Sequence, residues 1–101
     1  MTETIFSCIT LRALLRLYQV HLRPLPDGRW AGPQPLSVRP GAALILSADG
    51  GSWSTNDTVP IGGDRLDLVA RMEWVTRERA ADLLHGVFPA ILEREGIPEE
   101  G

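Results

Sequence analysis

Hydrophobic and polar residues alternate most regularly in the last third of the chain, between Arg65 and Val75. The apolar side chains occupy the even positions, Leu66, Leu68, Ala70, Met72 and Trp74. Most of the intervening positions are charged, namely Arg65, Asp67, Arg71 and Glu73. Because successive side chains of a β-strand point to opposite faces, this pattern predicts a strand with one buried and one solvated face. Such a strand is typical of an antiparallel sheet that exposes one face to solvent.

The N-terminal segment predicts a helix over residues 3–16, which are largely apolar and free of Gly and Pro. Thr2 or Thr4 is available as its N-cap. Residues 17–23 then alternate like a strand and lead into the turn sequence Pro26-Asp27-Gly28, so we expect a strand there. The alternative is a longer helix that ends at Pro24, because arginines and a glutamine recur at helical spacing up to residue 23.

The middle of the chain predicts short strands and turns. Residues 24–41 contain five of the eight prolines, which disfavours regular central strands there. Residues 29–31 and 36–38 are nevertheless candidates for short strands. The apolar run 42–47 is consistent with a strand buried on both sides. Residues 48–64 form the longest stretch without periodicity, in which we expect a short strand near 58–61.

A second helix is expected to begin at Arg77, with Thr76 as its N-cap. Gly86 and Pro89 either kink this helix or divide it in two, and the unbroken apolar stripe favours a kink. Gly96 is expected at its C-terminal end. We therefore predict a single α+β domain over residues 1–101. Its small, mainly antiparallel sheet would be packed on one face by an N-terminal and a C-terminal helix.

The composition excludes some classes of protein. With 101 residues, 44% of them hydrophobic, the chain can fill one core, and no apolar run approaches the ~20 residues that span a bilayer. We expect no membrane association. The N-terminus does not resemble a secretory signal, and the single cysteine, Cys8, fits a reducing, cytoplasmic setting. All ten basic residues are arginine, which indicates a GC-rich bacterial or phage genome.

Charge is distributed unevenly along the chain. Residues 1–48 carry a net charge of +3 and residues 49–101 carry −6, which together give the net charge of −3. An acidic protein is a poor candidate for binding nucleic acid. A nucleic-acid-binding protein is our first alternative, and it would use the arginines of the N-terminal half, Arg12, Arg16, Arg23, Arg29 and Arg39.

No arrangement of residues predicts catalysis, a metal site or a cofactor. Cys8 with His21 or His85 would suggest a thiol nucleophile and its base, but the surroundings of Cys8 are those of a buried apolar residue. Glu78, Asp82 and His85 share a helical face, for which a solvated surface is the better explanation. The two Gly-Gly sequences are best explained as turns. A small enzyme built around His21 or His85 is our second alternative.

Trp53 is the most informative candidate for binding. It is surrounded by Gly, Ser, Thr and Asn in the longest aperiodic segment, where an exposed Trp could act as an interaction hot spot. The alternative is that Trp53 folds back onto the core, as most Trp side chains do. The predicted binding set is Ser52, Trp53, Asn56, Arg65 and Arg71. We therefore hypothesise a non-catalytic protein-binding or regulatory module, of adaptor or inhibitor type and encoded by a phage or mobile element. Its partner would be another protein or a second copy of the chain.

Overall fold

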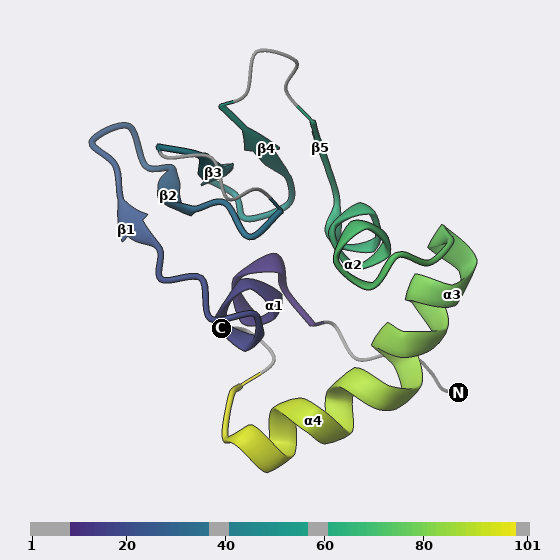
Figure 1. Ribbon diagram of the computed structural model, residues 1–101. Coiled ribbons are helices and arrows are strands. Elements are labelled where there is room, and N and C mark those ends of the chain that lie inside the picture. The colour runs from purple at the N-terminus through teal and green to yellow at the C-terminus, as the bar shows by residue number, and fades with distance from the viewer. Residues whose placement is uncertain (1–8, 37–40, 57–60, 99–101) are drawn as a thin grey trace.

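The computed structural model describes residues 9–36, 41–56 and 61–98, and it has an α+β fold (Figure 1). The strands of these residues are β1 (Arg23–Pro24), β2 (Trp30–Pro33), β3 (Ala43–Leu46), β4 (Trp53–Thr55) and β5 (Gly62–Gly63). The helices are α1 (Leu11–Leu17), α2 (Arg65–Glu73), α3 (Arg77–Asp82) and α4 (Phe88–Glu95), and a π-helical turn, η1 (Leu83–Val87), joins α3 to α4.

The five strands form one antiparallel sheet in which each strand pairs with the next along the chain. Leu46 of β3 lies opposite Trp30 of β2 and Trp53 of β4, so these side chains share a face of the sheet. The helices lie on one side of the sheet (Figure 1). The predicted small antiparallel sheet, packed on one face by helices, is confirmed.

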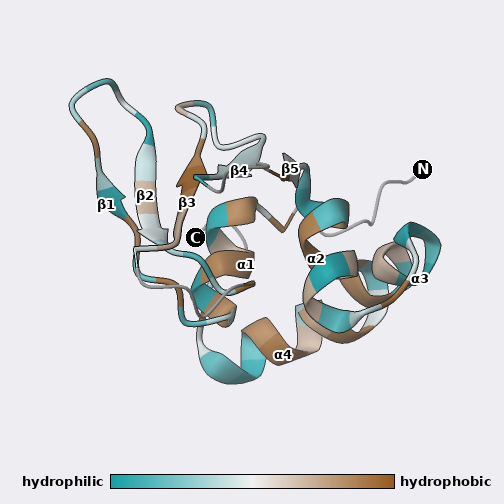
Figure 2. Cartoon of the chain, turned by 45° about the horizontal axis from the view of Figure 1, so that its top comes forward, coloured by the Kyte–Doolittle hydropathy of each residue, from teal (hydrophilic) through white to brown (hydrophobic). Residues whose placement is uncertain are grey.

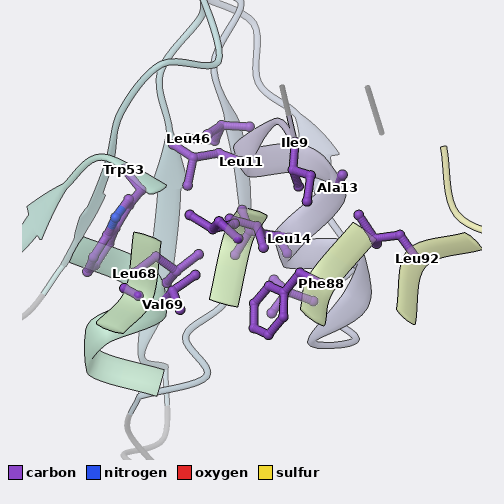
Figure 3. Close-up of a cluster of buried hydrophobic side chains, with 14 of the residues drawn as sticks. Ile9, Leu11, Ala13, Leu14, Leu46, Trp53, Leu68, Val69, Phe88 and Leu92 are labelled. Atoms are coloured by element: carbon purple, nitrogen blue, oxygen red, sulfur yellow. The ribbon is translucent and has the colours of Figure 1, made fainter. Parts of the chain in front are cut away.

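A single cluster of buried side chains joins the sheet to all the helices (Figure 3). Leu14 and Leu15 of α1 and Leu44 and Leu46 of β3 have no exposed surface. Hydrophobic residues on α1, α2 and α4 alternate with hydrophilic ones around each helix (Figure 2), as expected for helices that bury one side. From the C-terminal helices the core receives Ala80, Leu84, Phe88 and Leu92.

The strand predicted over residues 65–75 is wrong, because the structure forms helix α2 there. Asp64 caps the helix: its side chain accepts a hydrogen bond from the backbone N–H of Asp67, and the Asp67 side chain accepts one from the N–H of Asp64. This reciprocal capping box satisfies two donors that a helix start leaves unpaired. Leu68 and Val69 then enter the core from one side of α2, and the even-numbered residues do not share a face.

The strand predicted over residues 17–23 is also wrong, except at its last residue. Helix α1 ends in a Schellman motif, with Gln19 in the left-handed conformation at φ 65° and the N–H of Val20 bonded to the carbonyl of Leu15. Strand β1 contains only Arg23 and Pro24. The expected N-terminal helix is confirmed over residues 11–16. It is wrong at residues 9 and 10, because α1 begins at Leu11 with Thr10 as its N-cap. The predicted residues 3–8 lie outside the described residues.

The C-terminal helix agrees with its prediction. The Thr76 hydroxyl accepts a hydrogen bond from the N–H of Arg79, and Gly96 ends the helix in the left-handed conformation. The helix is continuous through Gly86 and Pro89, because the wider turn of η1 bonds Phe88 to the carbonyl of Leu83. A π turn inserts a residue into the helical register. Consequently Val87 turns outward, with 47% of its surface exposed.

The short strands of the middle segment are partly confirmed. The strand expected at residues 29–31 is present as β2, which extends to Pro33. The strand expected at residues 42–47 is present as β3, but only Leu44 and Leu46 are buried, so it is not buried on both sides. The strands expected at 36–38 and 58–61 fall mainly outside the described residues. No described helix is both long enough and apolar enough to span a membrane.

Candidate functional site

The structure separates the five residues that the sequence predicted as a binding set. Ser52 lies in the β3–β4 turn, where its N–H donates to the Ser47 hydroxyl. The Asn56 side chain accepts from the N–H of Ala43 and donates to the carbonyl of Gly41, which holds the segment before β3. The Arg65 guanidinium donates to the carbonyl of Ile9 at 2.9 Å. Three of the five residues therefore make contacts that support the fold, at separate places.

Trp53 is a core residue, contrary to the hypothesis that it is an exposed hot spot. Only 3% of its surface is exposed, and its indole N–H donates to the carbonyl of Asp64 at 2.8 Å. Figure 3 shows its ring beside Leu68 at one side of the buried cluster. The alternative explanation, in which Trp53 folds back onto the core, is confirmed. A side chain with no free surface cannot supply contact area to a partner.

Trp74 shows the opposite behaviour, because we expected it in the core and it is 93% exposed. It follows the last residue of α2 and has φ 58° and ψ 48°, in the left-handed region. The N–H of Val75 closes the turn on the carbonyl of Ala70, as in a Schellman motif. Glycine is the usual residue at this position, and a bulky side chain there is a conformational outlier. The backbone therefore holds the Trp74 ring away from the core.

Trp74 lines a groove of about 590 Å³, which we call the Trp74 groove. Among the described residues, three segments line it: the end of α2 with the turn after it, the segment after β2, and the residue before β5. Its described lining residues are Gln34, Leu36, Ile61, Ala70, Arg71, Trp74 and Val75. Leu36, Ile61 and Val75 are half-buried, so each retains apolar surface that solvent reaches. Of the predicted binding set, only Arg71 belongs to this groove.

The described lining of the groove carries one charged side chain. Arg71 is exposed and is the only charged residue among the described residues that line it. The neighbouring acid, Glu73, accepts a hydrogen bond from the Tyr18 hydroxyl at 2.9 Å. Burial raises the pKa of Tyr18 well above its usual value, and Glu73 raises it further, so the phenol stays protonated and donates. This contact ties the end of α1 to the end of α2, beside the groove.

A second polar contact fixes the start of α2 to the start of α3. The Arg77 guanidinium pairs with the carboxylates of Asp64 and Asp67, which raises the pKa of Arg77. Partial burial raises the pKa of Asp64, but the N–H of Asp67 and the guanidinium of Arg77 outweigh it, so the pKa lies below its ordinary value. Polar contacts therefore fix both ends of α2, and Trp74 follows the end that Tyr18 contacts.

The structure describes four of the five arginines of the nucleic-acid hypothesis. Arg12 and Arg16 lie on the exposed side of α1 beside Trp30, whereas Arg29 pairs with Asp27 at 2.7 Å. Arg23 is exposed in β1, and Arg39 lies outside the described residues.

The structure describes only some of the residues considered for chemistry. Glu78, Asp82 and His85 are exposed, and no group of three or more His, Cys, Asp or Glu among the described residues is placed to hold a metal ion. Cys8 lies outside the described residues, so the structure does not test it as a nucleophile. No protein-family model, curated protein or solved structure matches this chain.

Proposed function

We propose that the protein is a non-catalytic protein-binding module of regulatory type, which binds its partner through the Trp74 groove. The observation that carries this proposal is a nearly fully exposed Trp in a backbone conformation that suits glycine. A left-handed L-residue costs roughly 1–2 kcal/mol. Strained residues and exposed apolar surface are both concentrated at functional sites.

The exposed ring offers more binding energy than any other described side chain. A Trp buries roughly 150–250 Å², which corresponds to about 4–6 kcal/mol before the entropic cost of association is subtracted. Trp74 and Val87 are the large hydrophobic residues that the described part of the chain leaves exposed, and Val87 is only half as exposed. Trp is also among the residues most enriched at interaction hot spots.

The lining of the groove indicates the chemistry of the partner. The half-buried aliphatic side chains suit an apolar anchor residue, which would pack between Trp74 and Val75. Arg71, as the one described charge at the groove, suits a carboxylate next to that anchor. The proposed partner is therefore a different protein that presents an apolar side chain flanked by an acidic one. The single cysteine of the chain is compatible with a cytoplasmic partner.

The test begins by replacing Trp74 with a photoreactive benzophenone amino acid in the host cell and identifying the protein that becomes cross-linked. Ala90, which is exposed on α4 and outside the groove, carries the same group as the matched control. We expect a cross-linked partner from position 74 only. The affinity of the purified partner for the chain is then measured by isothermal titration calorimetry.

Trp74→Ala should weaken that affinity by at least about 2 kcal/mol, roughly 30-fold, as for a hot-spot residue. Arg71→Glu should weaken it as well, and Arg94→Glu, an exposed arginine on α4, should leave it unchanged. Unchanged affinity for Trp74→Ala, or identical adducts from both photoreactive positions, would contradict the proposal. A cross-link to a second copy, accompanied by dimerisation in solution, would contradict the choice of a different protein as partner.

A further inference from the structure

A second surface hollow, beside α1, has the composition of an anion site. It measures about 380 Å³, and its described lining residues are Arg12, Arg16, Val20, His21, Leu22 and Trp30. This volume lies within the range of small-molecule pockets. Its two arginines come from one face of α1, His21 comes from the segment after α1, and Trp30 comes from β2.

Two exposed arginines of α1 line this hollow. Arg12 and Arg16 are four residues apart on α1 and both are exposed, which places like charges next to each other on one helix face. No carboxylate of the described residues forms an ion pair with either of them. Adjacent like charges repel each other and destabilise a helix, and an anion bound between them would offset this repulsion.

One of the arginines is already oriented. The guanidinium of Arg12 lies over the Trp30 ring, 5.0 Å from its centroid, and this cation–π contact restricts the side chain before any ligand arrives. A guanidinium held in this way presents its remaining donors as a fixed fork, which matches the oxygens of a phosphate. The imidazole of His21 lines the same hollow and supplies a third nitrogen.

Two features limit the ligand to a small molecule with an apolar part. Val20, Leu22 and Trp30 supply apolar surface beside the arginines, which suits a ring attached to the anion. On the opposite side of Arg12 and Trp30 a neighbouring hollow is lined by Asp49. A carboxylate there interrupts the positive surface, so a long polyanion would meet repulsion where a single phosphate would not.

We propose that this hollow binds a phosphate monoester of a planar ring, such as a nucleoside monophosphate. The phosphate would lie between Arg12 and Arg16, and the ring would contact Trp30 and Leu22. This site is separate from the Trp74 groove and does not depend on the function proposed there.

The test is a titration of the full chain with adenosine 5′-monophosphate, followed by ¹H–¹⁵N NMR. Inorganic phosphate and adenosine are titrated separately, to distinguish recognition of the phosphate from recognition of the ring. We expect saturable shifts around Arg16 and the Trp30 indole with the nucleotide, weaker binding of inorganic phosphate, and no binding of adenosine alone.

Arg16→Gln removes one guanidinium without touching the Arg12–Trp30 contact, and it should weaken nucleotide binding about tenfold or more. Arg94→Gln, on α4, should bind like the unaltered chain. Absence of saturable shifts in the unaltered chain would overturn the proposal, as would equal losses in both variants. A single-stranded oligothymidine that binds more tightly than the mononucleotide would also overturn it, in favour of a nucleic-acid surface.

Discussion

Replacing Trp74 separates its role in binding from any role in folding. Because 93% of its surface is exposed, the side chain removes only about 20 Å² from solvent, which is worth about 0.5 kcal/mol. Trp74→Ala should therefore change the free energy of unfolding by no more than that amount. Alanine retains the left-handed conformation, so the backbone strain remains in this variant.

Trp74→Gly should be more stable than Trp74→Ala. Glycine adopts the left-handed conformation without the strain of roughly 1–2 kcal/mol that alanine has there. The greater conformational freedom of glycine in the unfolded chain lowers the free energy of unfolding by about 0.5–1 kcal/mol. The expected difference between the two variants is about 0.5–1 kcal/mol in favour of glycine. A packing role predicts the opposite order, because glycine fills less space than alanine.

Urea denaturation followed by far-ultraviolet circular dichroism measures both variants without relying on Trp fluorescence. Trp53→Ala serves as the comparison, because that ring is buried and its removal should cost about 3–5 kcal/mol. If Trp74→Ala lost a similar amount, or if Trp74→Gly were less stable than Trp74→Ala, the description of Trp74 as an exposed, strained residue would be refuted.

Three further predictions concern the fold that supports the groove. The pKa of Asp64 is lowered in the folded chain, so its contribution to stability is complete above its ordinary pKa of 3.8 and is lost as the pH falls through the lower folded value. The free energy of unfolding, measured as a function of pH, should therefore fall in this range. Asp64→Asn should make that fall smaller. Gly63→Ala should lower the free energy of unfolding in urea by roughly 1–3 kcal/mol. Gly63 has φ 150°, and a methyl group there would overlap the Asp67 carboxylate. Stability equal to that of the unaltered chain would contradict this geometry. Tyr18→Phe removes the hydrogen bond to Glu73 of α2, and it should lower the free energy of unfolding, measured by thermal denaturation, by about 0.5–1.5 kcal/mol. An unchanged value would show that the bond is absent in solution.

The errors in the sequence-based prediction have identifiable physical causes. Residues 65–73 alternate like a strand, but they include one β-branched residue, Val69, among strong helix formers. Asp64 and Asp67 stand at capping-box spacing, with Asp in place of the usual Ser and Glu. The two hydrogen bonds of that box start a helix, and Leu68 and Val69 bury its side. Local capping and propensity therefore prevailed over an alternating pattern.

The C-terminal helix could be predicted because its ends are marked by residue types with a direct mechanism, the Thr76 hydroxyl and the Gly96 conformation. The groove could not be predicted in this way. It requires knowing that Trp74 follows a helix rather than lying within a strand, and that Leu36 and Ile61 come to lie beside it. The available signal was Asp64 with Asp67, because a capping box before residue 65 marks a helix, and a helix of ordinary length would end near Trp74.

The proposed function requires that Trp74 is exposed in the free chain and becomes covered when the partner binds. Hydroxyl-radical footprinting with mass spectrometry measures this exposure at each Trp of the unaltered protein. We expect rapid labelling of Trp74 and slow labelling of Trp53 in the free chain, and protection of Trp74 once the cross-linked partner is added in excess. Slow labelling of Trp74 in the free chain, or rapid labelling that persists when the partner saturates the protein, would contradict the proposed function.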